Sequence, residues 1–297
     1  MRIHDEWATA GFALPAAAAD TSVFPGRDFL SRWWAHFGTG QPRLLEHDSA
    51  LLPLWHRPDG TLSLVGDEDL TDYHSPLGAG AGALLGGYLN DLPPGTRFRF
   101  DSLPSEAAAE LAAGINGVEA VRHGAAFRID LPASFDDFLA GLSKKERHEL
   151  RRKYRRFEEV LGRPRLLGGT PDPVGVFVEL HRLAAGGKGK FMTAKRESFF
   201  RELALLPATR VDVLAGEAGT PVAASIGFQD DRAYYLYNSA YDPRVAASSP
   251  GMVLLWKLFE SAIEGGSVLF DFLKGDEDYK LRLGAQPRPL YILEGRT

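Results

Sequence analysis

The chain of 297 residues contains no cysteine, which excludes disulfide bonds, thiolate metal sites and a cysteine nucleophile, and suits a reducing compartment. It also lacks an apolar run of about 18 residues, and its first residues carry acids where a secretory signal needs bases, so we expect a cytoplasmic protein with no membrane-spanning helix. The eight histidines are scattered without the spacing of metal ligands, and no metal is expected. The patterns GxxxxGK[ST], GxSxG and HExxH are absent, which leaves nucleotide-loop, serine-hydrolase and zinc-protease chemistry without support.

The residues that are present are typical of a globular protein, with 44% apolar and 25% charged residues. The length allows one large domain or two ordinary ones. The net charge of −5 argues against nucleic-acid binding by the whole surface, but the segment KKERHELRRKYRR (Lys144–Arg156) holds eight Lys or Arg against two Glu. This segment reads as an amphipathic helix with a basic outer side. That side is either a solvated face or a binding site for an anionic group.

The order of patterns predicts a mixed α/β fold. Capping-box spacings predict helices that begin after Ser134 and after Ser143. Residues 210–241 alternate like three strands joined by tight turns, and a helix over 251–264 and strands over 267–273 and 289–295 follow.

The sequence also contains an internal similarity. Ser75-Pro76, an apolar segment and Asp101 are matched by Ser249-Pro250, an apolar helix and Asp271, with 26 and 22 residues from serine to aspartate. We therefore expect two copies of one structural unit, over 1–133 and 134–297.

Two glycine-containing turns suggest ligand loops. GAGAGA at 78–83 matches GxGxxA, but it follows Ser-Pro-Leu instead of a strand, so dinucleotide binding is not favoured. The turn Ser249-Pro250-Gly251 opens an apolar helix, whose unpaired first N–H groups attract anions, with Ser249 as a candidate N-cap. An ordinary capped helix start explains the same residues.

The stretch FDFLKGDEDYK, 270–280, places charge at the end of a strand. Strand alternation puts Asp271 on the same face as Leu269 and Leu273, so its carboxylate needs a partner or has a raised pKa. The acids at 276–278 need no role beyond the first turn of a helix, where they complement its dipole. Asp271 is therefore either functional or structural.

Several of these stretches resemble a known family: YNSAYDP, SPGMVLL and FDFLKGDEDYKLRLGA near the C-terminus, WWAHFG and GDEDLTDYHSPLG near the N-terminus, and LSKKERHELRRKYRR with ELHRLAAGGKGKF between them. The chain resembles the GNAT-type acetyltransferases of the CelD/BcsL-like (BioF2-like) group, which are related to the FemAB-type aminoacyl transferases. The resemblance implies tandem GNAT-like modules, each a mixed, mostly antiparallel sheet flanked by helices. In the segment RVAASSPG, 244–251, Arg244 and Ala247 are roughly in register with the usual GNAT pyrophosphate loop [QR]xxGx[GA], but the glycines of that loop are missing.

The activity implied by the resemblance is transfer of an acyl group, most plausibly acetyl, from acyl-CoA to an amine or hydroxyl. Asp271 or Asp276 is implied as the base or the carboxylate that orients the acceptor, and Tyr279 as the acid that protonates the leaving thiolate. The acyl-CoA cosubstrate is expected at Asn238, Ser239, Arg244, Ser249, Gly251 and Met252. Substrate contacts are expected at Asp72, Tyr73, Arg151, His181, Lys188, Tyr237, Lys274 and Lys280.

Alternatives remain open at this point. Tyr237 can be a core aromatic, and Asp72 and Tyr73 can simply pack a loop. The basic helix also suits tRNA phosphates, as in the aminoacyl-transferring relatives, which makes aminoacyl-tRNA-dependent transfer the second hypothesis. The third is a non-catalytic accessory protein of polysaccharide or envelope assembly.

Overall fold

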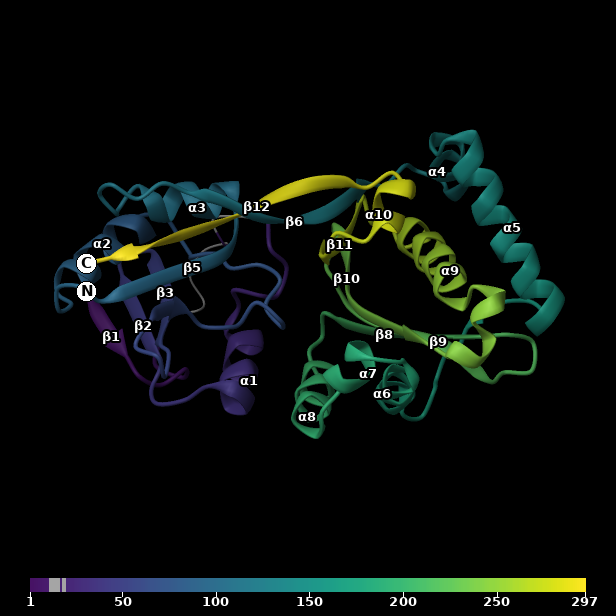
Figure 1. Cartoon of the computed structure of the whole chain (residues 1–297), viewed down its shortest axis with the longest axis horizontal. Helices are drawn as coiled ribbons and strands as arrows, with labels where there is room; N and C mark the ends of the chain where they lie inside the picture. The colour runs from purple at the N-terminus through teal and green to yellow at the C-terminus, as the bar shows by residue number, and fades with distance from the viewer. Residues whose placement is uncertain (11–16, 18–19) are drawn as a thin grey trace. The chain divides into compact units, whose positions relative to one another are not determined.

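The computed structural model describes residues 1–10, 17 and 20–297, except the side chain of Lys188 (Figure 1). The chain divides into two compact units: unit 1 is Met1–Ala126 with Arg288–Thr297, and unit 2 is Phe127–Pro287. Strands β6 (Val121–Asp130) and β12 (Gln286–Arg296) have residues in both units. The C-terminal strand, placed by the sequence pattern with the second module, therefore contributes its last residues to unit 1.

Unit 1 is a mixed sheet with the strand order β1-β2-β3-β4-β5-β12. The neighbours pair antiparallel, except that β4 and β5 are parallel. Its elements are β1 (Arg2–His4), α1 (Arg27–Phe37), β2 (Arg43–His47), β3 (Ala50–His56), β4 (Leu62–Leu64), α2 (Ala81–Asn90), β5 (Arg97–Pro104), α3 (Ser105–Ala112) and the end of β12.

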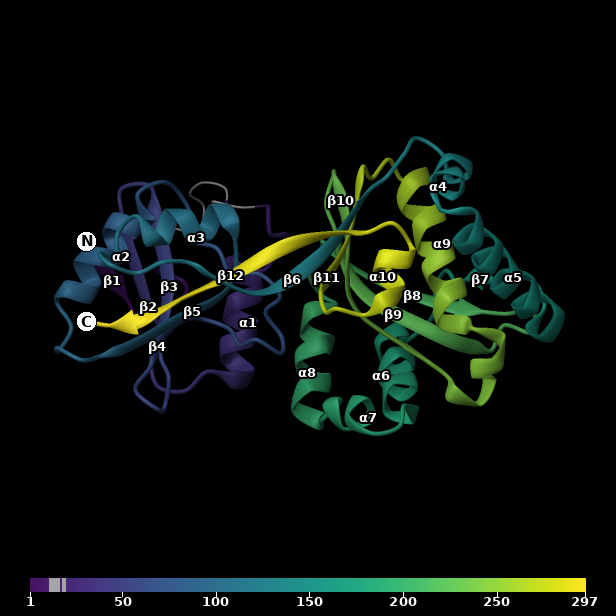
Figure 2. The same cartoon turned by 45° about the horizontal axis from the view of Figure 1, so that its top comes forward.

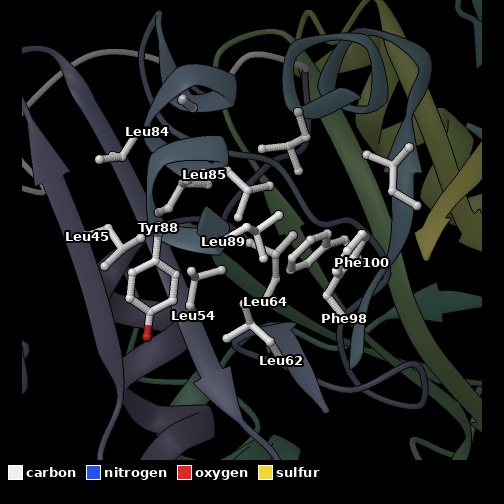
Figure 3. Packing of buried hydrophobic residues seen from close by; sticks show 14 of the residues in the cluster. Leu45, Leu54, Leu62, Leu64, Leu84, Leu85, Tyr88, Leu89, Phe98 and Phe100 are labelled. Atoms are coloured by element: carbon white, nitrogen blue, oxygen red, sulfur yellow. The ribbon is translucent and has the colours of Figure 1, made fainter. Parts of the chain in front are cut away.

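The core of unit 1 lies between the strands and the helices α2 and α3. Figure 3 shows side chains of α2 packed against strand residues; the labelled members of this core include Leu54, Leu62, Leu64, Leu85, Leu89, Phe98 and Phe100. Alternate residues of the strands supply this face, as the period of a β-strand requires.

Glycines let α2 approach the end of α3 closely. A Cβ atom on Gly86 would lie 2.1 Å from the Gly114 carbonyl oxygen, and one on Gly82 would lie 2.1 Å from the Glu110 carbonyl oxygen. Real Cβ atoms do not approach backbone this closely, so the glycine-rich segment serves helix packing. The glycines of the GxGxxA match itself, Gly78 and Gly80, have left-handed backbones with φ of 76° and 85° just before α2, which explains them without a dinucleotide.

Unit 2 is a second mixed sheet, with the order β6-β11-β10-β9-β8-β7. Strands β7 to β10 are antiparallel, and β10 and β11 are parallel. Its elements after β6 are α4 (Phe135–Gly141), α5 (Lys144–Leu161), β7 (Arg165–Leu166), α6 (Pro173–Leu183), α7 (Gly187–Phe191), α8 (Ala194–Leu203), β8 (Thr209–Ala215), β9 (Pro221–Gln229), β10 (Ala233–Tyr241), the 3-10 helix η1 (Pro243–Ser248), α9 (Pro250–Glu264), β11 (Leu269–Lys274) and α10 (Asp278–Arg282).

Helices cover both faces of the unit 2 sheet. Figures 1 and 2 show α6, α7 and α8 on one side of the strands and α9, with α5 beyond it, on the other. Ser134 and Ser143 accept hydrogen bonds from the N–H groups of Asp137 and Glu146, which confirms both predicted helix starts. The predicted fold class, mixed α/β with mostly antiparallel strands flanked by helices, is confirmed as well.

None of the helices in the described part of the chain combines the length and the apolar character that a membrane crossing requires. Within residues 1–10, 17 and 20–297, no three His, Asp or Glu side chains gather as metal ligands would.

Substitution of Gly86 by alanine should destabilise unit 1 by about 2 kcal/mol, because the added methyl group meets the backbone of Gly114. Gly87→Ala is the matched control, since Gly87 is an exposed neighbour on α2 with open space around its Cα. Alanine there should leave stability unchanged or raise it by up to about 1 kcal/mol. Urea unfolding of the whole chain measures both, and equal midpoints for the two variants would contradict the packing explanation.

Candidate functional site

The parallel strands β10 and β11 separate partway along their length. Their pairing joins Ala233 to Leu269, Tyr234 to Phe270 and Tyr235 to Asp271, and ends there. β10 continues to Tyr241 and β11 to Lys274, so the two strands are no longer paired with each other beyond this point. We call this opening, Leu236–Tyr241 opposite Phe272–Lys274, the β10–β11 divergence.

A β-bulge in β10 lies at the divergence. Leu236 pairs with Gly227 and Asn238 pairs with Ile226, so Tyr237 is an extra residue in β10 relative to β9. Bulges redirect the backbone and are frequent beside functional sites. Asn238 and Ser239, predicted to face the cosubstrate through their N–H groups, follow directly. The Tyr237 ring packs near Phe200 and Phe228, with centroid distances of 5.6 and 5.2 Å, so its side chain contributes to the core.

The turn before α9 differs from its expected form. Ser249 has a left-handed backbone, with φ of 56°, and among the described residues its hydroxyl makes no capping hydrogen bond to α9. The prediction that Ser249 caps the helix by its side chain is therefore wrong, because a capping residue normally has extended backbone angles. Its carbonyl oxygen instead accepts from the N–H groups of Met252 and Val253. Gly251 and Met252 are half-buried in the first turn, where the helix dipole is positive.

Arg244 lies in η1, where a GNAT pyrophosphate loop was expected. Its guanidinium donates to both oxygens of Asp242 at 2.7–3.1 Å, and this hydrogen bonding holds the pKa of Asp242 below its ordinary value. The Arg244 side chain remains largely exposed, so it stands at the surface beside the start of α9.

Asp271 is completely buried, and both of its carboxylate oxygens are used. Oδ2 accepts a hydrogen bond from Arg128 Nε at 2.8 Å, and Oδ1 accepts one from the N–H of Leu273 at 2.7 Å. The prediction that this carboxylate has a partner is confirmed. Arg128 was missed by sequence reasoning, since it lies in β6, 143 positions earlier. A weak signal existed: Arg128 and Asp130 are the two charged residues that alternate with apolar residues in FRIDL.

The segment after β11 carries Tyr279 on α10. Its ring packs edge-on against Phe272, and burial, followed by the charge of Glu277, raises the pKa of Tyr279 above its ordinary value. The phenol is therefore protonated at neutral pH and able to donate a hydrogen bond. Asp276 precedes α10 and is exposed.

Lys280 fixes this segment. It is buried, and its ammonium donates to the carbonyl oxygens of Lys274 and Gly275 at 2.8 and 3.0 Å and pairs with Glu277 at 2.9 Å. These three acceptors match the three donors of an ammonium group, which favours a structural role. Substrate binding by Lys280 stays a prediction, as does the role of Lys274, whose side chain is half-buried.

The remaining predicted substrate residues belong to both units. In unit 1, Tyr73 is buried near Phe24, with a 6.0 Å centroid distance, and lies under the Arg288 guanidinium; Asp72 precedes it and is half-buried. This supports the loop-packing alternative for Tyr73. In unit 2, His181 is buried on α6 beside the rings of Phe177 and Phe191, which also favours packing. The side chain of Lys188 lies outside the described residues.

The basic helix α5 lies against α9, with Tyr154 stacked near Trp256 at a centroid distance of 4.5 Å. Some of its charge is paired internally: Glu149 binds Arg152 at 2.8 Å and lies 3.7 Å from Lys153. Arg151 is exposed. The start of α5 borders a surface pocket of about 700 Å³, lined by Lys144, Lys145, Glu146, His148, Glu149 and Arg282.

Unit 2 contains another buried carboxylate, which sequence reasoning missed. Asp212 of β8 accepts a hydrogen bond from the Tyr234 hydroxyl at 2.9 Å, and burial raises the pKa of Asp212 despite the nearby Arg210. The signal was a single acid in the alternating strand RVDVLA. Asp212 lies on β8, three places from β11 in the sheet and away from the β10–β11 divergence.

Comparison with known families and structures gives a consistent result. Residues 144–281, from the start of α5 into α10, match the family described as Acetyltransferase (GNAT) domain. A comparison with the curated proteins gives no match. The CelD/BcsL-like group stays a prediction.

Three solved structures illustrate the fold. A conserved protein of unknown function from Bacteroides thetaiotaomicron is 14% identical, with a TM-score of 0.67 and 99% of each chain covered. L-PGS from Bacillus licheniformis is 14% identical, with a TM-score of 0.56 and 93% of each chain covered. FemX is 10% identical, with a TM-score of 0.58, 90% of this chain and 91% of that chain covered. At these identities the similarity concerns the fold alone.

The raised pKa of Asp212 predicts a pH dependence of stability. Since the folded chain holds this proton above the ordinary pKa of 3.8, its free energy of unfolding should fall as the pH rises from about 4 through the raised folded pKa. Each unit of pKa difference is worth about 1.4 kcal/mol. Asp212→Asn should remove this part of the dependence, and the exposed Asp231→Asn should not. Urea unfolding between pH 4 and 7 measures it; parallel curves for wild type and Asp212→Asn would refute it.

Proposed function

We propose that unit 2 transfers an acyl group, with acetyl as the first candidate, from acyl-CoA to an amine or hydroxyl. The observation that carries this proposal is the β10–β11 divergence, which lies inside the residues that match a GNAT acetyltransferase domain. An extended, amide-rich ligand can hydrogen-bond to backbone groups where two strands separate. The pantetheine part of CoA is such a ligand.

The bulge supports a role in polarising the thioester. Tyr237 is the extra residue of β10, so the backbone at Asn238 and Ser239 is displaced from the regular ladder. An N–H group directed into the divergence can donate to the thioester oxygen, where negative charge develops as the acceptor attacks. This role depends on the backbone, so any side chain at Asn238 or Ser239 is compatible with it.

The proton transfers can be assigned to the segment after β11. The acceptor's nitrogen or oxygen attacks the thioester carbon, its proton passes to a carboxylate, and the carbon–sulfur bond breaks. The exposed Asp276 suits the base better than Asp271, both of whose oxygens are already hydrogen-bonded. Tyr279 donates to the leaving thiolate; its raised pKa makes it a hydrogen-bond donor at neutral pH.

Phosphate binding is supported by the start of α9 and by its charged surroundings. Gly251 and Met252 lie in the first helical turn, and Arg244 is exposed in η1 just before it. α5, with its basic face, packs on both η1 and α9. These groups compensate for the glycines that the loop lacks.

The chain should bind acetyl-CoA with one site per molecule in isothermal titration calorimetry. Gly251→Glu should weaken this binding at least about tenfold, since a carboxylate at the first turn of α9 repels phosphate while it suits the helix dipole. Ala194→Glu is the matched control, because it places the same charge in the exposed first turn of α8. Absence of acetyl-CoA binding by the wild type would overturn the proposed function.

Tyr279→Phe should lower turnover about 100-fold while acetyl-CoA affinity stays within about twofold, because only the proton donor to the thiolate is removed. Release of the CoA thiol from acetyl-CoA, with water or a panel of amines as acceptors, measures turnover, and calorimetry measures affinity. Turnover equal to the wild type would exclude the acid role of Tyr279.

Aminoacyl-tRNA-dependent transfer is the second candidate, and the observation that favours it is the basic helix α5, whose start borders a surface pocket with Lys144, Lys145 and Arg282 in its lining. Charged tRNA should then bind with an affinity that falls steeply with salt, because phosphate contacts release counterions. Such binding without acetyl-CoA binding would favour this candidate, while acetyl-CoA binding without tRNA binding would favour the first.

A further inference from the structure

The β10–β11 divergence begins where both strands break their ladder. The last pair joins Tyr235 to Asp271, so the register, if continued, would pair Leu236 with Phe272 and Tyr237 with Leu273. Tyr237 is the bulged residue of β10. Leu273 has a left-handed backbone with φ of 58°, a conformation that is rare and strained for a leucine. Neither residue keeps the extended geometry that another rung requires.

On the β11 side, the cause of the break is a side chain of the same strand. The Leu273 N–H donates to Asp271 Oδ1 at 2.7 Å, an interaction between a side chain and the backbone two residues later. Aspartate hydrogen bonds of this type compete with regular secondary structure. A bond to a carboxylate is also stronger than one to a carbonyl, so Leu273 gains a better partner than the ladder offers.

The carboxylate is itself fixed from the opposite strand. Arg128 of β6 donates from Nε to Asp271 Oδ2 at 2.8 Å, and β6 is the other neighbour of β11. The Asp271 side chain is fully buried, and the Arg128 side chain is only 18% exposed. A buried carboxylate held in this way has little freedom to rotate away from Leu273.

Unit 1 contains a related arrangement. Asp101 of β5 is 2% exposed and is followed by Ser102, whose φ is 57° and whose hydroxyl donates to Asp101 Oδ1 at 2.8 Å. Here the parallel pairing of β4 and β5 consists of Leu62 with Phe98. Both aspartates of the internal similarity are therefore buried beside a residue with a left-handed backbone, at a strand that leaves its parallel neighbour.

We propose that Asp271 is a positioning residue that opens the β10–β11 divergence by binding the Leu273 N–H while Arg128 holds its carboxylate. Its consequence for acyl transfer rests on the proposed function, because the divergence is the expected donor site. Asp271 then acts on the shape of the site through Leu273, and it neither takes nor gives the proton of the reaction.

Three variants test this proposal by amide hydrogen exchange and by acetyl-CoA binding. Asp271→Ala removes both hydrogen bonds, so exchange at the Leu273 amide should accelerate about tenfold or more. Acetyl-CoA binding should weaken and turnover should fall about 100-fold, as expected for misplaced groups. Asp271→Asn retains an oxygen that can accept from Leu273, so its losses should be clearly smaller. Asp212→Asn, which alters another buried carboxylate of the same sheet, should change neither measurement.

The pH profile separates positioning from base catalysis. If Asp271 positions Leu273, the turnover of Asp271→Asn should keep the wild-type pH profile. If Asp271 is the base, Asn and Ala should lower turnover equally and abolish the limb on the acid side of the profile, which would overturn the proposal. Should Asp271→Ala fail to fold, Asp271→Asn and Arg128→Lys provide the same comparison, with partial acceleration of Leu273 exchange expected in both.

The two proposals fail in different ways. Unchanged Leu273 exchange in Asp271→Ala would overturn the positioning role, even if acetyl-CoA binds normally. Absence of acetyl-CoA binding by the wild type would overturn the proposed function, while accelerated Leu273 exchange would still support Asp271 as the residue that ends the ladder.

Discussion

A buried strand can leave its neighbour only if its backbone N–H and C=O groups find other partners, and this constraint shapes the end of β11. Asp271 accepts from the N–H of Leu273, and Lys280 donates to the carbonyl oxygens of Lys274 and Gly275. One carboxylate and one ammonium therefore replace the missing strand. Some of the charged side chains in FDFLKGDEDYK therefore hydrogen-bond to the backbone of the site, whatever part the others take in its chemistry.

Such charges are costly to bury unless each has its own partner. Asp271 has Arg128, and Lys280 has Glu277. Loss of Arg128 would leave the fully buried Asp271 carboxylate uncompensated, at a cost of about 3–5 kcal/mol. Glu277 is 56% exposed and Lys280 keeps two carbonyl partners, so the loss of Glu277 should cost less. The site therefore depends on two successive contacts. Arg128 of β6 holds Asp271 of β11, and Lys280 of α10, the helix that also carries Tyr279, holds the end of β11.

The sequence predicted what depends on local pattern and missed what depends on contacts between distant segments. Capping by Ser134 and Ser143, the alternating strands and the burial of Asp271 follow from a few neighbouring residues, and the structure confirms them. The partner Arg128 and the bulge at Tyr237 arise from strand pairing, which no local pattern encodes. At Ser249 a local pattern gave a wrong prediction. A serine suits an N-cap, but the turn from η1 gives Ser249 left-handed backbone angles, and its side chain does not cap α9.

If Asp271 positions the backbone, the base for the acceptor must come from elsewhere in unit 2 or from the acceptor itself. Asp276 is exposed and stands between β11 and α10, in the segment that Lys280 fixes. An amine whose pKa lies near the working pH needs only a modest base, and an exposed carboxylate with water can serve it. A hydroxyl acceptor would require a stronger, more buried base than Asp276 provides. For the proposed acyl transfer, an exposed carboxylate at the end of β11 therefore suits an amine acceptor better than a hydroxyl.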